Sequence, residues 1–363
     1  MELGTLLSLV TQVKGSDLHL CPGEPPTMRV QRMIRRTKLP EVSGEQIGEM
    51  LKEVAGQERW ERFLEEWELD VAYVVPGAGR FRVNMYWDQE QPAACFHLIP
   101  SEVQSLDELG FPPVLKDIAM LPRGIVLATG PTGCGKSTTL AAMIDHVNEQ
   151  RPVHIITIED PVEFIHRPKL ASITQREIGI DTHSFAEALR HVMRQNPDVI
   201  LVGELRDLET IQLAITAGET GHLVFSTLHT LDAAQTIDRM VDVFEPHRQE
   251  QVRAQLAITL QAVISQDLLQ LADGSGLVPC LEIMLATPGI RNLIRERKTH
   301  QIYSLIQGGG GLGMQTFDQH LMALYSQGLV RGEEAMAKAS NPEEFSRIAK
   351  IHGKGQEAGP PPG

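Results

Sequence analysis

Apolar residues in the first hundred positions follow both helical and strand spacing. Residues 3–13 carry leucine and valine at helical intervals, and residues 43–67 predict helices with a break near Gly56. Two alternating runs around a Pro-Gly-Ala-Gly turn predict a hairpin over residues 69–87. We interpret residues 1–100 as a mixed α/β domain. The second run of the hairpin has two faces, an apolar one with Phe81, Val83 and Met85 and a polar one with Arg80, Arg82 and Asn84.

The pattern changes further along the chain. Helix-length segments alternate with short apolar runs, namely "GIVLATG", "HIITIED", "VILVGEL" and "LVFSTLHT". This alternation predicts a sheet in an α/β domain over residues 115–350. Ser184, followed three residues later by Glu187, predicts the start of one of the helices. Residues 101–114 are interpreted as a linker, and residues 351–363 as a disordered tail.

The composition is that of an ordinary globular protein. The chain has 363 residues, of which 42% are hydrophobic and 22% charged. The formal net charge of -14 argues against broad duplex binding, which needs a basic surface. No apolar run approaches the length that spans a bilayer, the start lacks a basic signal-peptide region, and the four cysteines form no CxxC pair. We therefore expect a cytoplasmic protein without a zinc site or a disulfide framework.

The segment "GPTGCGKST" has the spacing of a phosphate-binding loop. It follows an apolar strand and precedes a helix-forming run, which is the context that this motif requires. Glycines let backbone amides curl around phosphate oxygens, Lys136 would reach the β- and γ-phosphates of ATP, and Ser137 would offer its hydroxyl to Mg²⁺. A glycine-rich turn that matches by chance is the alternative. The predicted ATP-binding residues are Gly130, Thr132, Gly133, Cys134, Gly135, Lys136, Ser137 and Thr138.

Acidic residues follow two other predicted strands. Glu204 ends the run "DVILVGE", where a carboxylate suits Mg²⁺ or a water bound to it. Glu159, Asp160 and Glu163 cluster after "HIITI", and one of them is a candidate general base toward the attacking water. A helix-capping acid and a solvated acidic turn are the respective alternatives. The sequence has no N/TKxD-type base-reading element, which argues against a GTPase.

Two histidines bracket the run "LVFSTL". We expect His222 and His229 at strand ends near the phosphates, where they would sense the γ-phosphate. A pair of metal ligands is a weaker interpretation, because no third ligand lies at a useful spacing. A purely structural role for both histidines is the remaining alternative.

The segment "TPGIRNLIRERKTHQIYSLIQ", which begins at Thr287, predicts two short helices. Ile290, Leu293 and Ile294 fall at helical spacing and are expected to pack into the core. On periodicity alone the segment is ordinary core packing. The residues expected on its other, exposed side are Arg291, Asn292, Arg295 and Glu296.

With these motifs in place, the chain resembles the secretion ATPase superfamily, which includes type II secretion ATPases and type IV pilus motors. "GPTGCGKSTTLAAMI" is similar to its Walker A motif, "IITIEDPVEF" to its Asp box, "DVILVGELRD" to its Walker B motif and "TGHLVFSTLHT" to its His box. The pilus retraction motors are the most similar group. The tetracysteine motif usual in assembly motors is missing, and "GIRNLIRE" resembles the retraction signature, with Gly289 in place of the usual alanine.

This resemblance implies a PAS-like N-terminal α/β domain joined to a RecA-like P-loop ATPase domain. It also implies a homohexamer that binds ATP and Mg²⁺ between domains, with Glu163 as catalytic base and Glu204 organising the Mg²⁺. Arginines of the N-terminal domain are expected to reach the phosphates, and Arg80 and Arg82 are the candidates, with a solvated strand face as the alternative. The residues expected to couple hydrolysis to output are Arg291, Asn292 and Arg295.

The expected function is that of a hexameric motor that retracts type IV pili. It would act on a platform protein of the inner membrane and be held at the cytoplasmic face through that partner, without direct contact to nucleic acid. The closest alternatives are a pilus-assembly or type II secretion ATPase and an accessory retraction motor. A nucleic-acid translocase and an ATP-gated scaffold without turnover are more distant ones.

Overall fold

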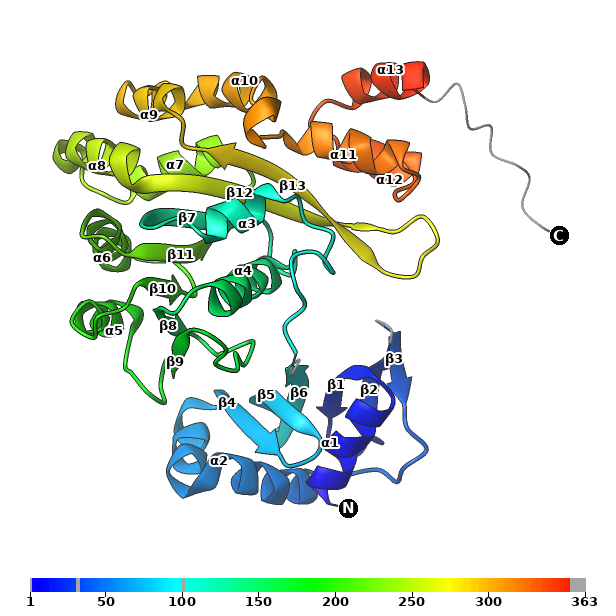
Figure 1. Cartoon of the computed structure of the whole chain (residues 1–363). Helices are drawn as coiled ribbons and strands as arrows, with labels where there is room; N and C mark the ends of the chain where they lie inside the picture. Colours follow the sequence, from blue (N-terminus) through cyan, green and yellow to red (C-terminus); the bar gives the residue numbers. More distant parts are fainter. Residues whose placement is uncertain (1, 31–32, 100–101, 353–363) are drawn as a thin grey trace. The chain divides into compact units, whose positions relative to one another are not determined.

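The computed structural model describes residues 2–30, 33–99 and 102–352. It divides into two compact units, drawn mainly in blue to cyan and in cyan to red in Figure 1. Residues 1–103 and 163–165 form one unit, and residues 104–162 and 166–363 form the other. The last helix runs to His352, so residues 351 and 352 of the predicted disordered tail are helical. The other residues of that tail, 353–363, lie outside the described residues.

The N-terminal unit is an antiparallel sheet backed by two helices. The strand order is β3-β2-β1-β6-β5-β4. Phe81, Val83 and Met85 of β5 are fully buried against both helices, so the predicted apolar face of this strand is confirmed. Gly56 breaks α2 at φ 72° and ψ 171°, also as expected. The elements are α1 (Leu3–Gln12), β1 (Gly15–Leu20), β2 (Thr27–Val30), β3 (Met33–Arg36), α2 (Gly44–Glu66), β4 (Leu69–Val75), β5 (Gly79–Asp88) and β6 (Gln91–Ile99).

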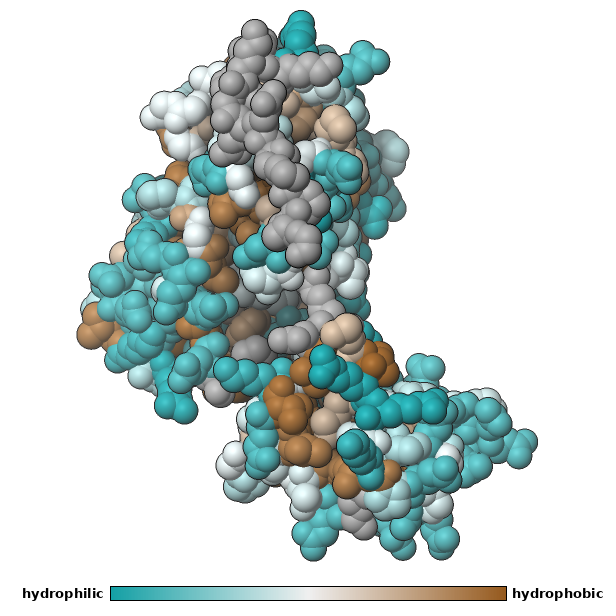
Figure 2. Space-filling model, turned by 90° about the vertical axis from the view of Figure 1, so that its right-hand side faces the viewer, coloured by the Kyte–Doolittle hydropathy of each residue, from teal (hydrophilic) through white to brown (hydrophobic). Residues whose placement is uncertain are grey.

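Apolar side chains also reach the surface of the N-terminal unit. Figure 2 shows them as brown patches among polar residues in the lower part of the view. Met33 and Ile34 of the edge strand β3 are 55% and 51% exposed. An edge strand also presents unpaired backbone groups, so β3 is a surface suited to contact with another chain.

The C-terminal unit is built on a seven-stranded sheet with helices on both faces. The strand order is β13-β12-β7-β11-β10-β8-β9, and every neighbouring pair except β12–β13 is parallel. Helices α3 and α4 cover one face, whereas α5 to α8 cover the other. The strands are β7 (Gly124–Thr129), β8 (His154–Glu159), β9 (Ser172–Glu177), β10 (Val199–Val202), β11 (Leu223–Leu228), β12 (Leu260–Gln270) and β13 (Leu277–Leu285).

The helices of this unit connect its strands and then continue beyond the sheet. They are α3 (Val114–Ala119), α4 (Lys136–Gln150), α5 (Phe185–Val192), α6 (Leu208–Glu219), α7 (Ala233–Asp242), α8 (Pro246–Thr259), α9 (Pro288–Arg295), α10 (Ile302–Gln307), α11 (Phe317–Ser326), α12 (Gly332–Lys338) and α13 (Pro342–His352). Ser184 caps α5 by accepting from Glu187 N at 3.2 Å, as predicted. Among the described residues, no helix is both long and apolar enough to cross a membrane.

Candidate active site

The predicted phosphate-binding and acidic segments lie at one edge of the parallel sheet. Strands β7, β11, β10 and β8 are neighbours, and Thr129 at the carboxyl end of β7 pairs with Leu228 at the carboxyl end of β11. The phosphate-binding loop follows β7, Glu204 follows β10, and His229 follows β11. The carboxyl edge of an open α/β sheet is where such folds bind ligands. The structure therefore gathers these three segments at a ligand-binding edge.

The loop between β7 and α4 is shaped as a phosphate cradle. Gly130, Gly133 and Gly135 adopt positive φ values of 137°, 78° and 88°, a region that favours glycine. Lys136 is only 8% exposed, and its Nζ donates to the carbonyl oxygens of Gly130 and Pro131 at 2.8 and 2.9 Å. Helix α4 begins at Lys136, so its positive amino end faces the loop. Backbone amides, a lysine and a helix amino end together suit a chain of phosphates.

The other residues of the motif differ in their surroundings. Thr132 lies at the exposed tip of the loop, and Ser137 and Thr138 lie half-buried in the first turn of α4. Cys134 is buried, and burial raises the pKa of its thiol, so the side chain stays neutral. The hydroxyl of Ser137, in the first turn of α4, remains the candidate oxygen for a metal ion beside the phosphates.

Gln266 of β12 backs the phosphate-binding loop, and the sequence interpretation missed it. Its Nε2 donates to Cys134 O at 2.6 Å, and its Oε1 accepts from Thr139 Oγ1 at 2.6 Å. The preceding residue, Ser265, accepts from Thr129 Oγ1 at 3.0 Å through its own hydroxyl. The polar residues inside the apolar run "AVISQDLL" indicate that polar partners are buried there, but they do not identify the loop as the partner.

Glu204 is held by two basic side chains. Its Oε2 lies 2.8 Å from Arg206 Nε, and its Oε1 lies 3.2 Å from His229 Nε2. The Glu204 side chain is 18% exposed, so it is partly accessible to solvent. The predicted site residues Glu204 and His229 are thus in direct contact. Arg206 also contacts Glu204, and the sequence interpretation did not single it out.

His222 does not join this group, so the expectation that both histidines lie near the phosphates is wrong. His222 precedes β11 at its amino end, where its carbonyl accepts from Gly124 N at 2.9 Å and its Nδ1 lies 3.0 Å from Ala217 O. His229 follows the same strand at its carboxyl end. A strand of this length spans roughly 20 Å. Within the C-terminal unit, His222 is therefore part of the opposite edge of the sheet.

The three acidic residues after the apolar part of β8 differ in burial. Glu159 is 9% exposed, whereas Asp160 and Glu163 are exposed. Val162 N donates to Glu177 Oε2 at 3.2 Å, and Glu163, the next residue, is grouped with the N-terminal unit. Asp160 and Glu163 are therefore accessible to a water molecule, and Glu159 is closed in.

Arg80 and Arg82 lie on the polar face of β5, as the alternation predicts. Both are half-buried, and Arg82 Nε lies 3.6 Å from Asp70 Oδ1 on the neighbouring strand β4. On the same sheet, Asp17 Oδ1 lies 2.8 Å from His97 Nδ1. The face that carries the two arginines is thus charged and belongs to the N-terminal unit.

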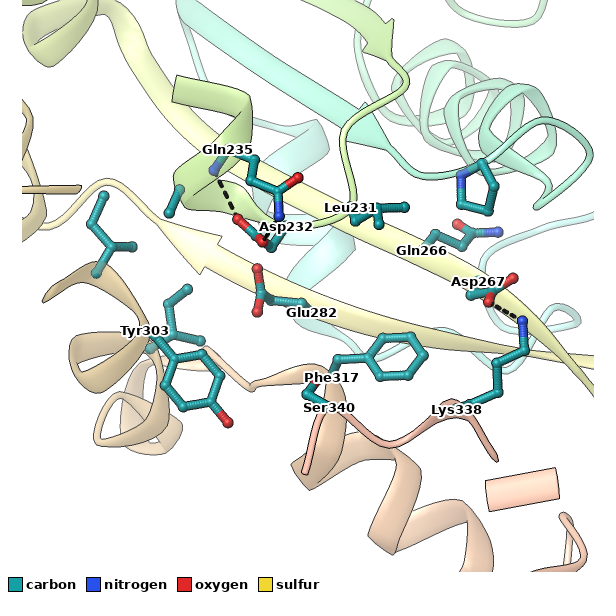
Figure 3. Close-up of a pocket in the computed structure, with 14 residues that line it drawn as sticks. Leu231, Asp232, Gln235, Gln266, Asp267, Glu282, Tyr303, Phe317, Lys338 and Ser340 are labelled. Carbon is teal, nitrogen blue, oxygen red and sulfur yellow. Dashed lines mark hydrogen bonds and ion pairs between the residues drawn. The ribbon is translucent and has the colours of Figure 1, made fainter. Parts of the chain in front are cut away.

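A cavity of about 470 Å³ lies beside the phosphate-binding loop within the C-terminal unit (Figure 3). Pro131 of the loop forms part of its wall, and Lys338 forms another part through an ion pair with Asp267 Oδ2 at 2.5 Å. Glu282 of β13 points into it, and its Oε1 accepts from Ala233 N at 2.9 Å. Burial raises the pKa of the Glu282 carboxyl to about 7. No sequence motif marks this residue.

Arg291 is not the free exposed residue that the helical pattern predicts. It is half-buried, and its guanidinium donates to Ala257 O and Ile258 O, each at 2.7 Å, and to Gln261 Oε1 at 3.0 Å. These acceptors lie at the end of α8 and just beyond it, so Arg291 caps that helix.

The rest of α9 keeps more closely to the pattern. Asn292 and Arg295 are exposed, and Asn292 Nδ2 donates to Glu296 Oε1 one turn later at 2.8 Å. Ile290 and Ile294 are fully buried as expected. Leu293, in contrast, is only half-buried.

Similar proteins were found by family, by sequence and by structure. A family model described as "Type II/IV secretion system protein" matches residues 95–332. A Pseudomonas aeruginosa (strain PAO1) protein described as "Type IV pilus retractation ATPase PilT" is 50% identical over 345 residues, which cover 95% of this chain and 100% of that protein. A "Twitching motility protein" from Neisseria gonorrhoeae is 52% identical over 321 residues, or 88% of this chain and 86% of that protein.

The structural comparison agrees with the sequence comparison. A crystal structure of the pilus retraction motor PilT with bound ADP is 42% identical, with a TM-score of 0.89, and the match covers 96% of this chain and 99% of that chain. The expected fold, an N-terminal α/β domain with a P-loop ATPase domain, is confirmed by this match. Because the family model spans well over half of the chain and relatives at about 50% identity span most of it, this chain belongs to the Type II/IV secretion system protein family of ATPases.

Proposed function

We propose that this chain is an ATP-hydrolysing motor that retracts type IV pili. The observation that carries the ATPase part is the phosphate cradle at the same sheet edge as the Glu204–His229 pair. A cradle alone binds phosphates, whereas an adjacent carboxylate and histidine supply groups that hydrolysis needs. The retraction part is supported by the relative described as a pilus retraction ATPase, which this chain matches over that relative's whole length.

Lys136 is the first group to act in this proposal. Its Nζ now donates to two carbonyl oxygens of the loop, and ATP would replace them with oxygens of the β- and γ-phosphates. Charge then develops on the transferred phosphoryl group next to a buried ammonium, where electrostatic stabilisation is stronger than in water.

The donor set beside the loop fits Mg²⁺. Ser137 offers a hydroxyl and Glu204 a carboxylate, and Mg²⁺ prefers oxygen ligands with several waters retained. Arg206 and His229 already engage both oxygens of Glu204, which favours its contact with the ion through a water. When bound, Mg²⁺ would neutralise phosphate charge. The protein would position the Ser137 hydroxyl and the Glu204 carboxylate, and His229 orients that carboxylate.

Glu163 is the proposed general base. It is exposed and directly follows Val162. A carboxylate there would accept a proton from the water that attacks the γ-phosphate. Arg80 and Arg82 are proposed to stabilise the same transition state from the N-terminal unit of a subunit in the ring.

The mechanical part of the proposal is a homohexamer whose N-terminal domains move against the ATPase domains during turnover. These motions would act on a platform protein, and through it the motor would sit at the cytoplasmic face of the inner membrane. The descriptions of the family and of the relatives, which name secretion, pilus retraction and twitching motility, support a motor in this setting. Direct nucleic-acid contact is not part of the proposal, given the net charge of -14.

Substitution of the candidate base tests the proposed chemistry. Glu163→Gln is expected to bind ATP normally and to lose about 10²- to 10⁴-fold in turnover, because a glutamine cannot accept the proton. Asp160→Asn is the matched control, since Asp160 is an exposed acid of the same turn. Steady-state phosphate release and calorimetry with ATP provide the two readouts. Normal turnover in Glu163→Gln combined with a loss in Asp160→Asn would move the base to Asp160.

A further inference from the structure

We propose that Gln266 is a positioning residue that holds the phosphate-binding loop in the conformation that accepts the phosphates of ATP. This inference rests on the proposed ATPase function and adds a residue to it. Gln266 lies on β12, far from the loop in sequence, and is only 4% exposed. Its two side-chain hydrogen bonds, to Cys134 O and from Thr139 Oγ1, are both 2.6 Å long.

The bond to Cys134 sets the direction of a backbone amide. In a trans peptide the C=O of one residue and the N–H of the next point in opposite directions. Gln266 Nε2 holds the Cys134 carbonyl on the β12 side of the loop, so Gly135 N–H is directed to the other side. Backbone N–H groups on that side are the ones that cradle phosphate oxygens in such loops. One side-chain donor thereby orients one phosphate-binding donor.

The same residue limits the loop at two further points. A Cβ added to Gly130 would lie 2.1 Å from the carbonyl oxygen of Gln266, so the loop begins in close contact with the main chain of β12. Thr139, whose hydroxyl donates to Gln266 Oε1, lies in the first turns of α4. Gln266 therefore contacts the start, the middle and the far end of the phosphate-binding segment. A loop held at these points does not have to reorganise when phosphate binds.

Gln266→Met tests this role, because methionine has a similar length and removes both hydrogen bonds. The dissociation constant for ADP and the KM for ATP are expected to rise about tenfold, and kcat is expected to change less than about threefold. A tenfold change in binding corresponds to about 1.4 kcal/mol, which is the size of the loss expected when one hydrogen-bond donor is misdirected. Gln315→Met is the matched control. Gln315 also donates to a buried strand carbonyl, that of Leu281 at 3.0 Å, but away from the loop.

The outcomes separate positioning from general stability. A tenfold weaker ADP affinity in Gln266→Met but not in Gln315→Met, at similar melting temperatures, supports the proposal. Affinity within about twofold of the parent overturns it, and so does an equal loss in Gln315→Met. If Gln266→Met does not fold, Gln266→Glu keeps an acceptor for Thr139 Oγ1 and removes the donor to Cys134 O, and unchanged ADP affinity there would also overturn it. A parent protein that binds ADP but does not hydrolyse ATP would instead defeat the proposed function.

Discussion

Glu282 shows how burial changes the chemistry of one side chain. Desolvation raises the pKa of its carboxyl to about 7, and Asp232 and Asp318 add to the rise, while the hydrogen bond from Ala233 N opposes it. In the unfolded chain the same group titrates near 4.5. Between pH 4.5 and 7 the folded protein therefore keeps a proton on Glu282, whereas the unfolded chain has released it. The free energy of unfolding consequently falls as pH rises through this range.

Glu282→Gln should remove this pH dependence. Glutamine keeps an acceptor for Ala233 N without a charge, so the variant is expected to become more stable than the parent as pH rises from 5 to 8, by an amount on the order of 3 kcal/mol at most. Urea unfolding at both pH values measures it. Glu245→Gln is the control, because Glu245 has a side chain that is 72% exposed. Parallel pH profiles of the parent and Glu282→Gln would contradict the assignment.

Arg80 and Arg82 are predicted to act as arginine fingers. Arg80→Ala and Arg82→Ala should each slow hydrolysis, by up to about 10³-fold, while nucleotide binding and the melting temperature change little. Arg62→Ala is the control, since Arg62 forms an exposed ion pair with Glu66 one helical turn away. Phosphate release at saturating ATP is the measurement. Parental rates in both finger variants would place the fingers on other residues.

At this scale, residues inside contiguous motifs could be predicted from the sequence. Lys136, Glu204 and His229 lie at the same edge of the sheet because each follows the carboxyl end of a parallel strand. The expectation for His222 is wrong because this residue precedes β11, and only residues that follow a parallel strand reach the ligand-binding edge. Gln266 could not be placed, because its contact with Cys134 joins positions 132 residues apart.

Among the elements, α8 and α9 depend on each other more than the sequence pattern indicates. Arg291 of α9 donates three hydrogen bonds to the end of α8 and the residues after it. Periodicity assigned Arg291 to the exposed side of its helix, and that side contacts a neighbouring helix end. Helix ends need partners for their last carbonyl groups, and a cation there is favourable. Arg291 is therefore first a structural residue, and Arg295 is the better candidate for output.

Single substitutions separate these two roles. Arg291→Ala is expected to lower the free energy of unfolding by about 1–3 kcal/mol, because the carbonyl groups at the end of α8 lose a charged donor. Arg295→Ala should change it by less than about 0.5 kcal/mol, since Arg295 is exposed. Denaturant unfolding of both variants decides between the roles. Equal stability of the two variants would show that the Arg291 contacts contribute little.

The elements themselves were largely predictable. The hairpin of β4 and β5, the break at Gly56 and the four short strands of the ATPase sheet all follow from periodicity and turn residues. The order of strands in the sheet did not follow, because β12 joins β7 through contacts between distant segments. That neighbour is the one that supplies Gln266.

On the scale of the whole molecule, we propose that ATP turnover in the C-terminal unit drives the withdrawal of pili. Arg295→Ala is the variant that addresses coupling, because it leaves both the phosphate-binding loop and the α8 cap intact. It is expected to hydrolyse ATP at the parental rate, and a loss of retraction in this variant would assign output to the exposed side of α9.

The central claim is tested most directly by counting surface pili in cells that lack this protein and carry back either the parent or Lys136→Ala. Lys136→Ala is expected to bind ATP at least about tenfold more weakly, since the buried ammonium faces the phosphates. The account predicts excess surface pili and no surface motility without the protein, restoration by the parent, and no restoration by Lys136→Ala. Bald cells in the deletion strain would contradict retraction and indicate a motor for pilus assembly.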